Sequence, residues 1–196
     1  GWYLHHPITL DGVTTSVCDV TFASTVRERL NAVDPDIVIH CASLVNVDQC
    51  GTNTALAERL NHLSAKHFVE ATLERKTILV YISTDAVYSG ESGNFSEEDP
   101  ICPQNYYGLS KYLGEWEFRR REDALILRTN FFGWNIQDKE SIGEWMINRL
   151  RVGERIFGFT DAIFSSMYTF DFARMLQRAF DEDLSGVFNI GSRTTL

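Results

Sequence analysis

Short apolar runs alternate along the chain with longer segments in which apolar residues recur at helical spacing. The runs predict five strands, at residues 15–20, 36–43, 77–83, 124–129 and 186–191. The helical patterns predict helices near residues 24–32, 54–75, 105–121, 141–151 and 171–181. DIVIHCAS (36–43) and TILVYIS (77–83) are apolar at most positions, which is typical of strands covered on both faces. The alternation predicts an α/β fold, a doubly wound parallel sheet with helices on both faces.

The helix predicted at 54–75 has a clear apolar stripe. The residues at helical spacing are Leu56, Leu60, Leu63, His67, Phe68 and Ala71. After the strand at 77–83, a long polar segment with glycine and proline, residues 84–104, predicts a loop. Ligands of such sheets bind outside the carboxyl ends of the strands, so the residues that follow each strand matter most.

Composition limits the class of protein. The 196 residues suffice for one well-buried domain, and 44% hydrophobic with 23% charged residues is typical of a globular protein. A formal net charge of −9 gives no basic surface for nucleic acid or an anionic membrane. No apolar run approaches the roughly 18 residues that span a bilayer. We therefore expect neither nucleic acid nor membrane as a partner.

The four cysteines predict a reduced, cytoplasmic protein. Cys18, Cys41, Cys50 and Cys102 are scattered, with no CxxC pair and no Cys/His spacing suited to a metal. Cys18 and Cys41 fall within apolar runs, as packing residues do. We expect four free thiols and no metal site.

The stretch NYYGLSK (105–111) contains a candidate acid–base pair. Tyr107 and Lys111 are four residues apart, so on a helix they share a face, whereas Tyr106 has Ser110 at that spacing. A neighbouring ammonium favours phenolate and should lower the pKa of Tyr107. Taken alone, an exposed helix with a chance pairing explains the motif equally simply. Thr84 changes this balance, because a hydroxyl at a strand end and Tyr107 can together hold a carbonyl oxygen between two donors.

Around these residues the chain resembles the extended short-chain dehydrogenase/reductase family, and within it the sugar-nucleotide reductases similar to dTDP-4-dehydrorhamnose reductase. The similarity rests on ISTDAVYSG (82–90), SEEDPICPQNYYGLSKYLGE (96–115) and LILRTNFFG (125–133), and it extends over most of the chain. It implies a Rossmann-like fold in which residues 1–196 form a single NAD(P)-binding domain, with 131–185 contributing substrate-binding elements.

The resemblance also implies roles for individual residues. Thr84, Tyr107 and Lys111 would be catalytic: Tyr107 would give its proton to the substrate oxygen, Thr84 would orient that oxygen, and Lys111 would contact the nicotinamide ribose. The other implied cofactor-binding residues are Asp19, Val20, Cys41, Ala42, Ser43 and Asn130, with Tyr107 and Lys111 included. Asp85 and Phe131 would contact a nucleotide-sugar substrate. A homodimer is left open as the assembly.

Departures from the family pattern limit the detail. Ala86 stands where such reductases usually have an aromatic residue, and Phe131 where they have tryptophan, so the particular sugar is left open. No acidic residue typical of NAD binding is evident in GWYLHHP (1–7), where His5 and His6 stand instead. This slightly favours NADP(H) over NAD(H), with two exposed loop histidines as the open alternative.

Two other functions compete with the reductase. A 4-epimerase or 4,6-dehydratase would use the same three residues, but the glutamate that dehydratases of this kind carry after Asp85 is replaced by Ala86. A non-catalytic regulatory or binding subunit with the same fold is the second alternative. The chain also contains no G-x-G-x-x-G turn, which a Rossmann enzyme uses to hold a pyrophosphate. We therefore expect an N-terminally truncated Rossmann unit, lacking roughly one strand, turn and helix.

Overall fold

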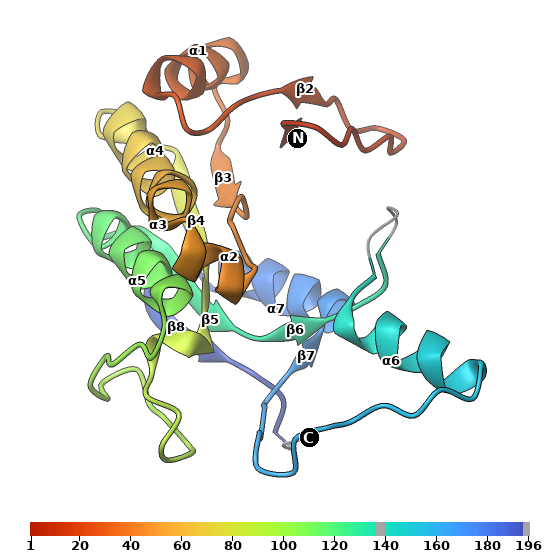
Figure 1. Cartoon of the computed structure of the whole chain (residues 1–196). Coiled ribbons are helices and arrows are strands. Elements are labelled where there is room, and N and C mark those ends of the chain that lie inside the picture. The colour runs from red at the N-terminus through yellow and green to blue at the C-terminus, as the bar shows by residue number, and fades with distance from the viewer. Residues whose placement is uncertain (136–139, 194–196) are drawn as a thin grey trace. The chain divides into compact units, whose positions relative to one another are not determined.

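The computed structural model describes residues 1–135 and 140–193 (Figure 1). These residues divide into two compact units. The first comprises Gly1–Leu127 and Ser185–Phe188, and the second comprises Arg128–Leu184 with the residues that follow Phe188. Each unit is described by itself. No helix among the described residues combines the length and the apolar character needed to cross a membrane.

The first unit is built on parallel β-strands. Its four-stranded sheet has the order β3 (Ile37–His40), β4 (Ile78–Thr84), β5 (Leu125–Thr129), β8 (Gly186–Ile190). β3 and β4 pair in parallel, with Ile37 opposite Ile78. A separate parallel pair joins β1 (Trp2–Tyr3) and β2 (Ser16–Val17). All five predicted strands are therefore present, although the first is reduced to two residues in β2.

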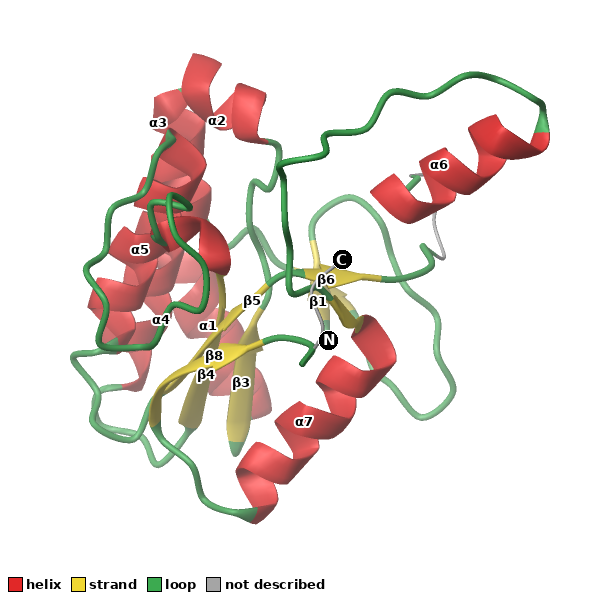
Figure 2. Ribbon diagram, turned by 90° about the horizontal axis from the view of Figure 1, so that it is seen from below, coloured by secondary structure: helices red, strands yellow, loops and turns green. Residues whose placement is uncertain are grey.

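Helices cover one side of this sheet (Figure 2). They are α1 (Ala23–Val33), α2 (Val47–Thr52), α3 (Thr54–Ala57), the π-helix η1 (Glu58–Leu63), α4 (Ser64–Thr72) and α5 (Tyr106–Phe118). The predicted helix at 54–75 is therefore a chain of three segments with a π-helical middle. The sequence did not predict α2, which begins where the Asn46 side chain accepts a hydrogen bond from the Gln49 amide.

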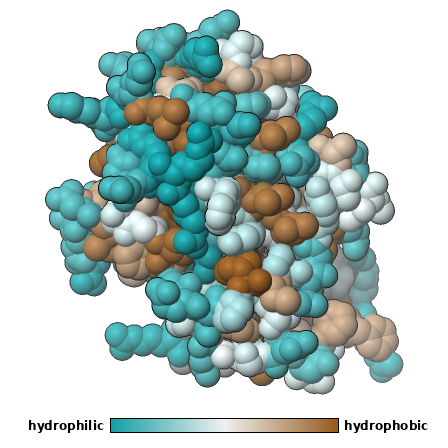
Figure 3. All heavy atoms as spheres, turned by 90° about the vertical axis from the view of Figure 1, so that its left-hand side faces the viewer, coloured by the Kyte–Doolittle hydropathy of each residue, from teal (hydrophilic) through white to brown (hydrophobic). Residues whose placement is uncertain are grey.

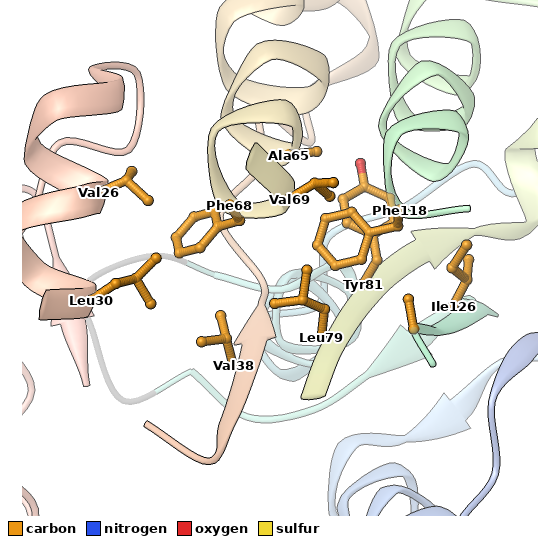
Figure 4. Close-up of a cluster of buried hydrophobic side chains, with 11 residues drawn as sticks. Val26, Leu30, Val38, Ala65, Phe68, Val69, Leu79, Tyr81, Phe118 and Ile126 are labelled. Carbon is orange, nitrogen blue, oxygen red and sulfur yellow. The ribbon is translucent and has the colours of Figure 1, made fainter. Parts of the chain in front are cut away.

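The hydrophobic core lies between these helices and the sheet (Figure 4). Its helical members are Val26, Leu30, Ala65, Phe68, Val69 and Phe118, and its other members are Val38, Leu79, Tyr81, Ala124 and Ile126. Side chains from α1, α4 and α5 thus meet those of three neighbouring strands. Figure 3 shows the opposite, outward surface of these helices, which is mostly hydrophilic with separate hydrophobic side chains.

The two central strands differ in how they are covered. Every residue of β4 after Ile78 is buried, as expected for a strand covered on both faces. In β3, Val38 and His40 are buried but Ile37 and Ile39 are 39% and 43% exposed, so the same expectation is wrong for this strand. A groove of about 270 Å³ runs along this strand, lined by residues of β3 and by Gly1, Trp2, Val20 and Phe68 among others.

The second unit contains a small parallel sheet and two helices. β6 (Phe131–Phe132) pairs with β7 (Met167–Tyr168). Helix α6 (Ile142–Arg151) begins with a capping box between Ser141 and Glu144, and α7 spans Thr169–Asp181. Both helices fall where the sequence predicts them.

Candidate active site

The buried strand β4 ends in a hydroxyl that shapes the turn after it. Thr84 is the last residue of β4 and is 5% exposed. Its Oγ1 accepts a hydrogen bond from the amide of Ala86 at 3.1 Å, which starts the short 3₁₀ turn η2 (Asp85–Val87). Because the cap holds the hydroxyl in place, Thr84 offers a fixed polar group at the carboxyl end of the sheet.

Helix α5 begins close to this turn. Asn105 caps the helix by accepting a hydrogen bond from the amide of Gly108 at 2.9 Å. A Cβ atom on Gly108 would lie 2.2 Å from the carbonyl oxygen of Ala86, so only glycine allows this approach. The close contact places the first turn of α5, with Tyr107, against the turn that follows Thr84.

The Thr84 side chain lies near enough to the Tyr107 phenol to act on its pKa. Burial raises the pKa of the Tyr107 phenol, hydrogen bonding by Thr84 acts to lower it, and the charge of Asp85 acts to raise it. The net direction is upward, opposite to the direction that the Tyr–Lys spacing predicts. Tyr106 points elsewhere: its hydroxyl donates to Oε2 of Glu58 at 3.3 Å. The structure therefore pairs Thr84 with Tyr107 and not with Tyr106.

Lys111 lies one turn further along α5, inside the protein. It is 2% exposed, its Nζ donates to the carbonyl oxygen of Ile82 at 2.6 Å, and it lies 4.1 Å from the centroid of the Tyr81 ring. Burial lowers the pKa of Lys111 to about 7, while Cys41 and Glu115 act to raise it. Lys111 is not among the groups that shift the pKa of Tyr107, and burial leaves that pKa raised.

A second buried charge follows on the same helix. Glu115 is fully buried, and the Ser83 hydroxyl donates to its Oε1 at 2.5 Å. Arg119 Nη2 lies 3.9 Å from the other carboxylate oxygen. Ser83 is the residue immediately before Thr84, so this contact ties the middle of α5 to the end of β4.

Asp19 and Val20, two of the predicted cofactor-binding residues, are each held by a neighbouring residue. Asp19 accepts hydrogen bonds from the Thr21 amide at 2.9 Å and from the Thr21 hydroxyl at 2.7 Å. Burial acts to raise the pKa of Asp19, but these two bonds leave it lowered. The carbonyl oxygen of Val20 lies 3.1 Å from Nδ1 of His67 on α4, which must donate to it.

The segment after β3 is fastened by one asparagine. Ser43 Oγ donates to Asn61 Oδ1 at 3.0 Å, and Leu44 exchanges hydrogen bonds with both ends of the same amide. Asn61 Nδ2 also donates to Ser110 Oγ of α5 at 2.9 Å. Asn61 is fully buried in the π-helix η1. The preceding residues Cys41 and Ala42 line the groove along β3.

Asn130 and Phe131, predicted to contact the cofactor and the substrate, belong to the second unit. The backbone carbonyl of Asn130 accepts from the Met167 amide at 2.9 Å, and its Oδ1 accepts from Ser166 Oγ at 3.1 Å. The Phe131 ring lies 5.5 Å from that of Phe172. Asp85, the other predicted substrate residue, is exposed and accepts from Thr84 Oγ1 at 3.2 Å.

Sequence reasoning missed three residues that build this site: Asn61, Ser83 and Glu115. A signal existed for Glu115, which is four residues after Lys111 and eight after Tyr107, and so shares their helix face. Ser83 could be inferred only once its partner was known. Asn61 gave no signal, because the π-helical turn that buries it interrupts the helical period without a distinctive residue pattern.

Comparison with known proteins gives one family. Residues 3–195 match the model of the family described as RmlD substrate binding domain. The chain is 31% identical over 183 residues to the probable low-salt glycan biosynthesis reductase Agl14 of Haloferax volcanii, covering 91% of this chain and 61% of that protein. It is 31% identical over 186 residues to methionine adenosyltransferase 2 subunit beta of Danio rerio, covering 90% and 56%.

A solved structure is similar to this chain in both fold and sequence. The crystal structure of dTDP-4-dehydrorhamnose reductase from Bacillus anthracis in complex with NADP has a TM-score of 0.86 and 28% sequence identity, covering 92% of this chain and 66% of that one. The similarity confirms the Rossmann-like α/β fold predicted from the sequence. The chain spans less than two thirds of the length of these two curated relatives.

Proposed function

Because the chain belongs to the family described as RmlD substrate binding domain, of the extended short-chain dehydrogenase/reductase type, we propose that it acts as an NAD(P)H-dependent reductase. The proposed substrate is a nucleotide-linked 4-keto sugar. One observation carries the proposal. The Thr84 side chain and the Tyr107 phenol lie close together at the carboxyl end of β4, with Lys111 one helical turn away. Similar proteins are named as reductases of sugars or glycans.

The two hydroxyl groups suit the reduction of a ketone. A carbonyl oxygen placed between Thr84 and Tyr107 would accept a hydrogen bond from each, and the Tyr107 phenol would give up its proton as the alkoxide forms. The raised pKa of Tyr107 keeps the phenol protonated at neutral pH, as a proton donor must be. Thr84 orients the oxygen because its own position is fixed by the η2 turn.

The residues present suit the sugar end of a nicotinamide cofactor. The Lys111 ammonium and the Tyr107 hydroxyl both offer donors for ribose hydroxyls. The bound cofactor would supply the hydride to the carbonyl carbon. Asp19, Val20, Cys41, Ala42, Ser43 and Asn130 remain the proposed cofactor contacts.

We propose NADP(H) as the preferred cofactor. His5 and His6 are exposed and stand where NAD-binding relatives would have an acidic residue, and the similar structure from Bacillus anthracis contains NADP. The ratio of kcat/KM for NADPH to that for NADH tests the preference. A ratio below one would reverse it.

Asp85 and Phe131 remain the proposed substrate contacts. Ala86, next to Asp85, supplies no carboxylate, so the acid–base pair of a dehydratase is incomplete and net reduction is favoured. A cytoplasmic location and a homodimeric assembly also stay as proposals.

A second candidate is a non-catalytic subunit. The observation that favours it is the 31% identity to methionine adenosyltransferase 2 subunit beta, a protein named as a subunit. Such a subunit would bind its partner without consuming a nicotinamide cofactor.

One experiment separates these functions. Purified protein is incubated with NADPH and a panel of nucleotide-linked 4-keto sugars, and both nicotinamide absorbance and sugar products are followed, with Tyr107→Phe as the control. The reductase predicts equal amounts of ketone and NADPH consumed. A rearranged sugar with no net loss of NADPH would indicate an epimerase. No reaction with any sugar, together with cofactor binding, would favour the binding subunit.

A further inference from the structure

Three side chains on one face of α5 are each tied to the end of strand β4. The helix residues are four apart, and their partners are three consecutive residues of the strand. The contacts are Tyr107 with the side chain of Thr84, Lys111 with the carbonyl oxygen of Ile82, and Glu115 with the side chain of Ser83. We call this set of three contacts the α5–β4 seam. Tyr107 and Lys111 are proposed catalytic residues, whereas Glu115 is not.

Glu115 is costly to bury, so its position calls for a compensating interaction. A fully buried carboxylate loses its hydration, and the 2.5 Å hydrogen bond from Ser83, together with Arg119 Nη2 at 3.9 Å from the other oxygen, replaces part of it. Lys111, one turn earlier on the same face, is also almost fully buried. Two opposite charges at this spacing stabilise each other, and more strongly in the interior than at a surface.

The other titratable groups around Lys111 do not supply a negative charge at neutral pH. Burial raises the pKa of the Cys41 thiol on β3 and of the Tyr81 phenol on β4. His40 on β3 is neutral, because burial and then the charge of Lys111 lower its pKa to about 3. Burial likewise raises the pKa of Tyr107 on α5. Among these described groups, Glu115 alone is left as the counter-charge.

We propose that Glu115 and Ser83 are positioning residues: the carboxylate favours the ammonium form of Lys111, and its bond to Ser83 holds α5 in register with β4 so that Tyr107 meets Thr84. The proposal rests on the proposed function only for the use that catalysis makes of Lys111 and Tyr107. The charge effect and the register effect can be separated by substitution, since Glu115→Gln removes the charge and keeps an oxygen for Ser83, whereas Ser83→Ala removes the bond and keeps the charge.

The charge effect is measured by NMR of the lysine Nζ, without any need for turnover. The chain has only four lysines, and Lys111→Met identifies the resonance. In the wild-type protein we expect Lys111 to titrate near pH 7. Glu115→Gln should lower that midpoint by about one pH unit, the usual effect of losing an opposite charge nearby. Glu117→Gln is the matched control, because it removes a carboxylate of the same helix that pairs with Arg120 and His62, and it should leave the midpoint unchanged.

An unchanged midpoint in Glu115→Gln overturns the charge effect. If that variant does not fold, Glu115→Met, an apolar side chain of similar length, must show the same downward shift. Because the titration reads Lys111 directly, an inactive protein with the expected shift would remove the proposed function and leave this inference standing.

The register effect is measured by turnover. Ser83→Ala should lower kcat about tenfold or more, since small misplacements of reacting groups are costly, while the KM for substrate and the Lys111 midpoint stay unchanged. Ser83→Thr, which restores a hydroxyl, should recover most of the loss. A Ser83→Ala variant with wild-type kcat overturns the register effect, as does a loss that the threonine does not recover.

Discussion

The phenol of Tyr107 lies close enough to the side chain of Thr84 for Thr84 to act on its pKa, although one residue comes from a helix and the other from a strand before a long loop. The neighbouring Tyr106 bonds instead to Glu58 of the π-helix. Adjacent residues on a helix point about 100° apart, so two consecutive tyrosines cannot serve the same partner. The difference gives a direct test of which phenol is the proton donor.

We expect Tyr107→Phe to lower kcat by roughly 100-fold or more while cofactor affinity changes little, because the variant loses only a positioned proton donor. Tyr106→Phe is the matched control and should keep kcat within a few-fold of wild type. Steady-state kinetics and cofactor titration measure both quantities. A larger loss in Tyr106→Phe than in Tyr107→Phe would contradict the assignment.

Gly108→Ala should disturb the site without changing any polar group. The added Cβ would lie 2.2 Å from the carbonyl oxygen of Ala86, a backbone atom that cannot move aside freely. We expect a loss of about 1–3 kcal/mol in unfolding free energy, typical of overpacking, and a fall in kcat as Tyr107 moves from Thr84. Gly51→Ala, in α2 with open space around it, is the control and should be neutral or stabilising. Equal behaviour of the two variants would disprove the close approach.

The buried Lys111 makes stability depend on pH. Its pKa falls from 10.5 to about 7 on folding, so between these values the unfolded state binds more protons and the wild-type protein gains stability as pH rises. Lys111→Met lacks this dependence. The difference in unfolding free energy by which the variant exceeds wild type should therefore shrink by about 2 kcal/mol between pH 7 and pH 9. Urea unfolding of both proteins at each pH measures the gap, and a constant gap would refute the lowered pKa.

His40 should produce a loss of stability in acid. Burial lowers its pKa from 6.5 to about 3, so its contribution is complete above pH 6.5 and is lost as the pH falls toward 3. Ser64 Oγ donates to the Leu60 carbonyl and therefore accepts from His40 Nε2, at 2.9 Å, which fixes the tautomer. We expect the ring to stay neutral at pH 5 by NMR, and His40→Phe to lose about 2 kcal/mol less stability between pH 6.5 and pH 5. His6→Ala, at an exposed residue, should follow wild type.

The sequence predicts the strands and the start of α5 well, since both depend on local signals. Strand β4 is buried on both faces and therefore has apolar residues at nearly every position, and Asn105 is a good helix cap in front of Tyr107. Ile37 and Ile39 show the limit of this signal. They are as apolar as their neighbours in β3, yet they are exposed, because burial depends on which elements pack on the strand.

The apolar stripe of the helix predicted at 54–75 is buried only in part. Phe68 lies in the core, but Leu56, Leu60 and Leu63 are only half-buried, while the polar residues Asn61 and Ser64 are fully buried. The π-helical turn at Glu58–Leu63 adds a residue to one turn and so rotates the buried face. A pattern with a period of 3.6 residues cannot register such a rotation.

The direction of Lys111 could not be predicted either. Spacing places it on the face of Tyr107, but only the structure shows that its Nζ reaches the carbonyl of Ile82. The pKa of Tyr107 depends on that detail, because burial outweighs the effect of a lysine that points elsewhere. The contributions of Asp19, Cys41, Asn130 and Phe131 to binding stay predictions.

The α5–β4 seam restricts how this part of the chain can change in length. One residue inserted between Tyr107 and Glu115 would turn all later side chains by about 100° around the helix axis, so Glu115 would face away from Ser83. One residue inserted into the loop at 89–104 moves no contact of the seam, and surface loops absorb added residues at little cost. Homologous chains should therefore vary in length before Asn105 and keep the spacing of Tyr107, Lys111 and Glu115 constant, so that the number of residues between them is under stronger selection than most of their neighbours.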